Sequence, residues 1–386
     1  MGTDKIIFYI CVLLIGLGIV FSLSMTTYIS LEKYGNEFHF FFRQFFAGVL
    51  SIFVMWAVSR LDPDRWFLPL GFLLFFLFMT LMTLMPFLPE SIVHAVGGAK
   101  RWMRLGFISL APVEFFKVGF IVFLAWSFSR KLDDRSKSLK EEFSVFWPYL
   151  LVFAVVTYLI AIMQNDIGQV IVLAVTLIMM GLMAGTSMRF FTVSFLGMLA
   201  LVAIGIVSSE HRVLRIKTWW SSIQNTVLSF LPDSLASRLR VSDIYEPYQV
   251  SRAHDAMQNG GFWGQGLGNG TLKLGFLSDV HTDFILAGIS EELGVAGLLL
   301  ILLLFFVLIF RILKIANRIE NRIYALFALG IAIMFASTFI INSFGVMGIT
   351  PVKGLAVPFL SYGGSSMLAH AVAIGMVLMI SKKVKY

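Results

Sequence analysis

The sequence has few charged residues. Only 13% of its 386 residues are Asp, Glu, Lys or Arg, whereas 58% are hydrophobic. This composition excludes a soluble domain, whose surface must be largely polar. The apolar runs repeatedly reach the roughly 20 residues that a membrane-spanning helix needs. We therefore expect an all-α polytopic membrane protein, with one integral-membrane domain over residues 1–386.

Cysteine is almost absent as well. The single residue, Cys11, lies inside the first apolar run, so we expect neither an internal disulfide nor a Cys/His metal cluster. No small-residue cleavage site follows this run, and we interpret it as a retained span rather than a signal peptide.

Hydrophobic periodicity and length predict ten transmembrane spans, which are separated by short loops except after the seventh. A large hydrophilic loop, about 209–282, joins the seventh span to the eighth. The predicted spans are about 6–24, 40–58, 66–88, 108–129, 145–163, 167–185, 190–208, 283–310, 324–344 and 355–380.

The distribution of Lys and Arg predicts that both termini are cytoplasmic, because short cytoplasmic loops are enriched in these residues. The segments on the inner side then hold Lys5, Arg60, Arg65, Arg130, Lys131, Arg135, Lys137, Lys140, Arg189, Arg311, Lys314, Arg318, Arg322, Lys382, Lys383 and Lys385. The short outer loops hold only Lys33, Lys100, Arg101, Arg104 and Lys353. The net charge of +8 thus reflects membrane topology, and we expect no nucleic-acid partner.

The stretch Ser278–Gly294 carries carboxylates where the large loop enters an apolar run. Asp283 falls at the expected boundary between water and lipid, and Glu291 and Glu292 lie about two helical turns deeper. Ionisable groups at such depth are costly and usually serve a function or have a partner. The alternative for Thr282 and Asp283 is that they cap the helix that follows.

Three further features lie on the same expected outer face. The cations around Arg101 and Trp102 indicate either attraction to lipid phosphates or an anion-binding surface. Glu114 and Lys117 share a helix face, as a structural ion pair or as a substrate contact. Asp166 is suited to capping the sixth span.

The remaining irregular segments contain glycine, proline and tryptophan. The glycines of 259–270 do not match a dinucleotide fingerprint, because no predicted strand precedes them. The tryptophans of the large loop, Trp219 and Trp220, favour short helices on the outer leaflet. Prolines and glycines in 348–366 indicate either a broken helix along a cavity or close helix packing. His370 is most simply a core histidine.

Polar residues therefore converge on the outer face and predict a site for an anionic, lipid-linked ligand. Composition and spacing do not distinguish catalysis from transport. The converging residues are Arg101, Glu114, Lys117, Gln164, Asp166, Gln249, Lys273, His281, Asp283 and Lys353.

Several motifs together resemble the SEDS family of bacterial peptidoglycan polymerases, and the Lys353–Gly354 pair resembles its cell-division members more than its elongation members. The motifs are Gly98–Trp102, Glu114 with Lys117, Gln164–Gly168, Tyr248–Gln249, Gly261–Gly268, His281–Ile285, Glu291–Gly294 and Pro358–Ser366. The chain departs from the family pattern in Ala111–Glu114, Asn165, Ser278–Asp279, Gly275 and a longer loop at 221–244.

The resemblance implies a glycosyltransferase that polymerises lipid II at the outer leaflet during septal wall synthesis, with Asp283 as general base. Arg101, Lys353 and Lys117 would stabilise the pyrophosphate leaving group, beside the ring of Trp102. His281 would orient the base or serve only structure. The implied substrate-binding residues are Arg101, Trp102, Glu114, Lys117, Gln249, Lys273, His281, Thr282, Lys353, Ser361 and Ser365.

The resemblance further implies the bacterial inner membrane, a class B penicillin-binding transpeptidase (FtsI-like) as partner, and contact with other divisome membrane proteins. The resemblance assigns no certain cofactor. A divalent cation, Mg²⁺ or Mn²⁺, at Asp283 is an alternative that no ligand cluster demands. The alternative functions are a lipid II flippase, a scaffold for the transpeptidase, and an elongation-type polymerase.

Overall fold

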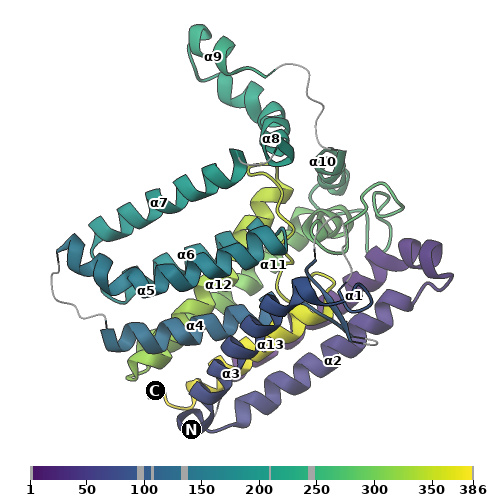
Figure 1. Ribbon diagram of the computed structural model, residues 1–386. Coiled ribbons are helices and arrows are strands. Elements are labelled where there is room, and N and C mark those ends of the chain that lie inside the picture. Colours follow the sequence, from purple (N-terminus) through teal and green to yellow (C-terminus); the bar gives the residue numbers. More distant parts are fainter. Residues whose placement is uncertain are drawn as a thin grey trace.

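The computed structural model describes residues 3–93, 100–105, 108–131, 138–207, 210–241 and 248–384, and shows a helical bundle (Figure 1). Within these residues nine helices are long and apolar enough to cross a membrane, and α6 is a shorter apolar helix. The predicted all-α fold is confirmed. The bundle helices are α1 (Lys5–Tyr34), α2 (His39–Arg60), α3 (Pro63–Leu84), α4 (Pro112–Lys131), α5 (Leu139–Thr157), α6 (Ile167–Met183), α7 (Met188–Val207), α11 (Ile285–Arg318), α12 (Arg322–Val346) and α13 (Gly364–Ser381).

Several predicted boundaries were wrong. The last helix begins at Gly364 rather than near 355, because residues 351–357 run without helical structure between Pro351 and Pro358. The fourth begins at Pro112 rather than 108, because β2 (Ile108–Leu110) pairs antiparallel with β1 (Met103–Leu105). Helix α3 is followed by the short 3-10 helix η1 (Met85–Phe87), and α5 by the π-helix η2 (Tyr158–Met163).

Both chain ends lie at the same end of the bundle (Figure 1). Asp4 pairs with Arg311 at the end of α11, and its backbone N–H donates to Ser381 Oγ in α13. Lys383 pairs with Asp64 at the start of α3. An even number of crossings follows from this placement. The sequence-based positions Gly98, Ala99, Arg135, Lys137 and Lys385 lie outside the described residues.

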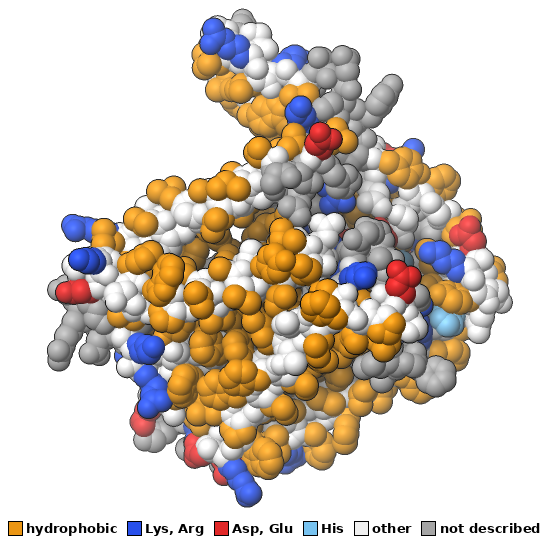
Figure 2. All heavy atoms as spheres, viewed as in Figure 1, with side chains coloured by type: hydrophobic (Ala, Val, Ile, Leu, Met, Phe, Trp, Pro, Cys, Tyr) orange, Lys and Arg blue, Asp and Glu red, His pale blue; other side chains and the backbone are white. Residues whose placement is uncertain are grey.

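Helices α4 and α13 form the centre of the bundle. Most of their side chains are buried, whereas α7 buries only Phe190. Helix α13 packs along α2, and α4 packs along α3 and also contacts α6 and α12. The hydrophobic side chains on the outside of the bundle are the surface that lipid chains would cover (Figure 2).

The large loop between α7 and α11 is partly helical. It contains α8 (Glu210–Leu228), α9 (Asp233–Leu239) and α10 (Tyr248–Gly260). Helix α10 packs on α11, whereas α8 and α9 project past the end of α7 (Figure 1).

Gly119 sets how closely α3 and α4 approach. A Cβ atom at this position would come within 2.3 Å of the backbone nitrogen of Phe75. We predict that Gly119→Ala lowers the thermal unfolding temperature, although alanine favours a helix by about 1 kcal/mol over glycine. The matched control is Gly197→Ala in α7, where no atom lies within 4 Å. Equal unfolding temperatures of the two variants in the same detergent would contradict the prediction.

Candidate functional site

Asp283 lies in the turn that precedes α11, half-buried at the end of the bundle opposite to the chain termini. Three buried or half-buried hydrogen bonds fix this turn. Asn342 Nδ2 donates to the carbonyl of Asp283 at 2.8 Å, Ser361 Oγ donates to that of Thr282 at 2.7 Å, and the Tyr362 N–H donates to that of His281 at 2.8 Å. The side chain of Asp283 is therefore presented by a backbone that α12 and the segment before α13 hold in place.

In the structure neither Thr282 nor Asp283 caps α11. The cap position is Phe284, and no side chain among the described residues accepts a capping hydrogen bond there. Thr282 Oγ1 instead donates to the carbonyl of Asp279. The carboxylate of Asp283 is thus left for another role.

Arg101 lies beside the Asp283 carboxylate, and both side chains border Gly354. A Cβ atom at Gly354 would lie 3.1 Å from Asp283 Oδ2 and 3.6 Å from Arg101 Nη1. Arg101 is itself held by Asp166, with Nε 3.3 Å from Oδ2, and its Nη2 donates to the carbonyl of Asn165 at 2.7 Å. The guanidinium is therefore held by the turn before α6 and lies next to the turn before α11.

Burial, with a smaller contribution from the nearby carboxylate of Asp279, raises the pKa of Asp283 to about 7, although Arg101 acts in the opposite direction. Burial also raises the pKa of Asp166 above its usual value, although Arg101 opposes that shift. A carboxylate with a pKa near 7 exchanges protons readily at neutral pH, as a general base must.

Asp166 links this site to a buried polar cluster. It caps α6, as predicted, by accepting from the Gln169 N–H. The side chain of Gln169 donates to Glu114 Oε1 at 2.7 Å and accepts from Lys117 Nζ at 2.8 Å. Lys117 Nζ also lies 2.8 Å from Glu114 Oε2, and His370 Nε2 lies 3.9 Å from the same oxygen.

The cluster is enclosed within the bundle. Lys117 is 1% exposed and Glu114 is 8% exposed. This geometry favours the structural ion pair over direct substrate contact, because neither charged atom reaches a surface that a lipid-linked ligand could touch. The sequence did not identify Gln169 as a site residue. The one signal available for it was a glutamine one helical turn inside an apolar run.

Lys353, Trp102 and Gln249 surround the Asp283 turn at the same end of the bundle. Lys353 is half-buried next to Gly354, and its Cβ packs against the start of α6 at Gly168. Trp102 follows Arg101 and is 36% exposed. Gln249 in α10 donates to Ser278 Oγ and to Asp279 Oδ2, at 2.8 and 3.1 Å.

Lys273 belongs to a different cluster. Its ammonium donates to Glu292 Oε1 at 2.6 Å, to Ser24 Oγ and to the carbonyl of Gly268. Glu291 accepts from the N–H groups of Thr271 and Leu272. These two deep glutamates therefore fasten the glycine-rich loop onto α11, and the structure does not bring Lys273 to Asp283.

The two serines that were predicted to bind substrate form hydrogen bonds with backbone groups instead. Ser361 is 2% exposed and accepts from the Val357 N–H while it donates to Thr282, and Ser365 accepts from the Ala111 N–H at 2.8 Å. The ring of His281 packs against Phe40 and Tyr362, and its buried Nδ1 has no hydrogen-bond partner among the described residues. Asn342, which also donates to the Leu355 carbonyl, was missed because it lies in an apolar run.

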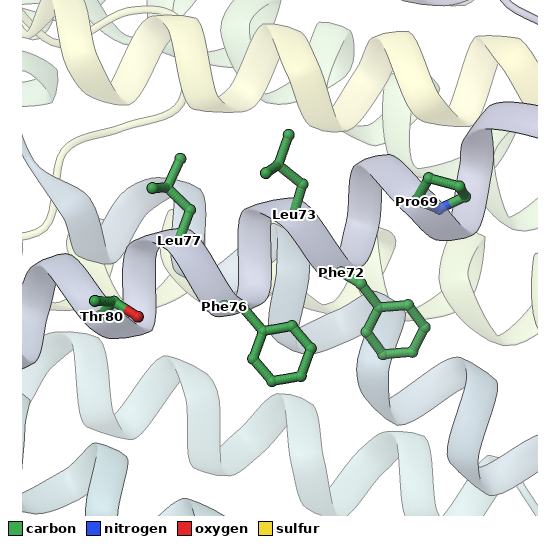
Figure 3. A pocket seen from close by; sticks show the side chains of 6 residues that line it. All are labelled: Pro69, Phe72, Leu73, Phe76, Leu77 and Thr80. Carbon is green, nitrogen blue, oxygen red and sulfur yellow. The ribbon is translucent and has the colours of Figure 1, made fainter.

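A recess of about 490 Å³ lies along α3, away from these residues (Figure 3). It is lined by Pro69, Phe72, Leu73, Phe76, Leu77 and Thr80. Such an apolar lining suits hydrocarbon rather than a sugar or a phosphate. Across the described part of the chain, no three His, Cys, Asp or Glu side chains gather where they could hold a metal ion.

Comparisons with known proteins agree with this architecture. Residues 4–386 match the family model of FtsW, RodA and SpoVE, described as "Cell cycle protein". The chain is 50% identical over 387 residues to a protein of Helicobacter pylori (strain ATCC 700392 / 26695) named "Probable peptidoglycan glycosyltransferase FtsW", with 100% of both chains covered. It is 34% identical to a protein of the same name from Trichlorobacter lovleyi, over 99% of this chain and 94% of that one.

Two solved structures share the fold. A chain from a structure described as "Structural coordination of polymerization and crosslinking by a peptidoglycan synthase complex" superposes with a TM-score of 0.72 at 21% identity, covering 99% of this chain and 98% of that chain. The rod shape determining protein RodA of Thermus thermophilus superposes with a TM-score of 0.67 at 21% identity, covering 100% and 99%.

The buried cluster supplies a stability prediction. Lys117→Met removes the cation and leaves the Glu114 charge buried, which should lower the free energy of unfolding by about 3–5 kcal/mol. The double variant Glu114→Gln/Lys117→Met removes both charges, and we expect it to recover most of that loss. Thermal and denaturant unfolding in detergent measure both effects. A double variant as unstable as Lys117→Met alone would show that the pair does not act as a unit.

Proposed function

Because the chain belongs to the SEDS family, which comprises FtsW, RodA and SpoVE, we propose that Asp283 is the base with which this peptidoglycan glycosyltransferase polymerises lipid II. The observation that carries the assignment is the position of Asp283. Its carboxylate is half-buried, has a pKa of about 7 and lies beside a cation at the end of the bundle. Resemblance to the cell-division relatives supports a role in septal wall synthesis.

The reaction needs a proton acceptor because a sugar hydroxyl is a weak nucleophile. The 4-hydroxyl of the incoming lipid II transfers its proton to Asp283 as its oxygen attacks the anomeric carbon of the growing strand. The bond from that carbon to the pyrophosphate oxygen breaks, and undecaprenyl pyrophosphate leaves with the electron pair. A single displacement of this kind inverts the anomeric configuration. The activated bond is already in the substrate, so the step consumes no nucleotide.

The leaving pyrophosphate requires positive charge near Asp283. Arg101 and Lys353 are half-buried at this end of the bundle, with Arg101 beside Gly354 and Lys353 next to it in the chain. Lys117 is enclosed with Glu114 and Gln169, so we assign it to support of Asp166 rather than to the leaving group. Of the three cations that the sequence analysis proposed for the leaving group, this assignment keeps Arg101 and Lys353.

The placement of charge supports an orientation in the bacterial cytoplasmic membrane. Lys5, Arg60, Arg65, Lys382 and Lys383 lie at the end that holds both termini, and this bias favours a cytoplasmic position for that end. Asp283 would then face the periplasm, where a class B penicillin-binding transpeptidase could crosslink the product. The solved structure of a peptidoglycan synthase complex supports such a pairing.

The alternative of a lipid II flippase needs charged groups along a path between the two leaflets. The half-buried Arg101, Asp283 and Lys353 lie at one end of the bundle, whereas Asp4 and Arg311 at the other end form an ion pair. The deeper charges of Glu114 and Lys117 satisfy each other. This arrangement favours chemistry at one leaflet. Lys353 and Gly354, together with the 50% identity to a relative named FtsW, favour the division type over the elongation type.

Removal of the base gives the most direct test. We predict that Asp283→Asn lowers the rate of lipid II polymerisation by about 10²–10⁴-fold, the usual worth of a general base. The rate is measured from labelled glycan ladders made by purified protein, alone and with its transpeptidase. Asp255→Asn, an exposed carboxylate of α10 paired with Arg252, is the matched control and should retain activity. A fully active Asp283→Asn enzyme would end the assignment.

The pH profile offers a second test. A base acts when deprotonated, so a pKa near 7 predicts a rate that rises from pH 6 to pH 8 and then levels. Asp279→Asn removes a neighbouring negative charge that raises the pKa of Asp283. The rising limb should therefore move to lower pH in this variant. A limb that stays in place, or moves to higher pH, would contradict the electrostatic account.

A further inference from the structure

Residues 210–241 form a helical hairpin, here called the arm, from α8, α9 and the residues that follow them. Four hydrogen bonds that involve side chains close it on itself, one of them from Arg240 Nη1 to Asn225 Oδ1 at 3.4 Å. Trp220 Nε1 donates to the Leu239 carbonyl at 2.8 Å, and Gln224 exchanges two bonds with the backbone of Val241, at 3.0 and 2.9 Å. The arm is therefore a defined element rather than an extended loop.

A side chain of α8 anchors the arm to the bundle. Trp219 Nε1 donates to the carbonyl of Gly348 at 2.9 Å, in the turn after α12. Beyond this point α8 and α9 run past α7, across its direction rather than along it (Figure 1). Because α8 begins three residues after Val207 ends the apolar helix α7, the arm starts where the chain leaves the membrane.

Large apolar side chains of the arm are exposed. Phe230, in the turn between the two helices, is 84% exposed, and Leu235 and Leu239 of α9 are each 48% exposed. Leu214 and Val227 of α8 are exposed as well. Hydrophobic side chains cover one side of the projecting arm in Figure 2. A surface of this kind is costly in water and needs an apolar environment.

Exposed cations accompany the apolar side chains. Arg215 and Lys217 belong to α8, whereas Arg238 and Arg240 lie at the end of α9. Helices with Trp, Phe and Leu on one side and Lys or Arg on the other lie in the interface of a membrane. Phosphate groups of anionic phospholipids complement these cations, whereas a purely apolar protein groove would leave them unmatched.

We propose that the arm lies in the headgroup region of the leaflet at the Asp283 end and binds its anionic phospholipids. Phe230, Leu235 and Leu239 insert among the upper acyl carbons, and the four cations contact lipid phosphates. The arm thereby fixes the turn at Gly348 through Trp219, six residues before Gly354. The membrane contact itself does not depend on the chemistry at Asp283.

The test uses the full-length protein in nanodiscs of phosphatidylethanolamine and phosphatidylglycerol. Phe230→Cys is labelled with an environment-sensitive fluorophore in a Cys11→Ala background, which removes the single native thiol. Ser237→Cys, exposed on the opposite side of α9 from Leu235 and Leu239, is the matched control. We expect lipids with a doxyl group near the headgroup to quench the Phe230 probe at least about twofold more than the control.

Substitution of Arg238 and Arg240 by Gln should reduce that quenching, and so should replacement of phosphatidylglycerol by phosphatidylcholine. Emission of the Phe230 probe that is as water-exposed as the control would overturn the proposal. Protection of the probe from both aqueous iodide and doxyl lipid would overturn it too, because the arm would then be covered by protein. Free inorganic phosphate that abolishes the headgroup dependence would show that the cations select no lipid.

Discussion

The pairing of Arg101 with Asp166 sets the electrostatic surroundings of Asp283. A guanidinium that was free to pair with Asp283 would depress the pKa of that carboxylate and weaken it as a base. Here Arg101 is engaged by Asp166 and by the carbonyls of Gln164 and Asn165, so its stabilisation of Asp283 is partial. Burial and Asp279 then dominate, and the pKa of Asp283 rises to about 7.

This arrangement demands that two turns distant in sequence keep a fixed distance. The turn before α11 is held by Asn342, Ser361 and Tyr362, all of which bond its backbone carbonyls. The turn before α6 is held by Asp166, whose partner Gln169 is locked by the buried pair of Glu114 and Lys117. The buried ion pair is thus connected to the surroundings of Asp283 through a chain of contacts.

The sequence predicted the features that depend on composition and local spacing. The ten predicted apolar spans correspond to ten helices, Asp166 caps α6, and Glu114 pairs with Lys117 one helical turn away. It did not predict Gln169 and Asn342, because a single amide in an apolar run has the same local signature whether it bridges charges or faces a carbonyl. It also misplaced Lys273, whose partner Glu292 is close only after the glycine-rich loop folds onto α11.

The difference between local sequence pattern and folded contacts also explains which cations could contact a pyrophosphate. Sequence treats Lys117, Lys273, Arg101 and Lys353 alike as positive residues near a predicted outer face. Folding sequesters Lys117 with Glu114 and Lys273 with Glu292, and each pair is internally neutral. Arg101 retains donors directed toward Asp283 and Gly354, where a developing negative charge would be stabilised. In the proposed reaction, the cations at the end of the bundle would therefore act on the substrate, whereas the buried ion pairs maintain the geometry of the site.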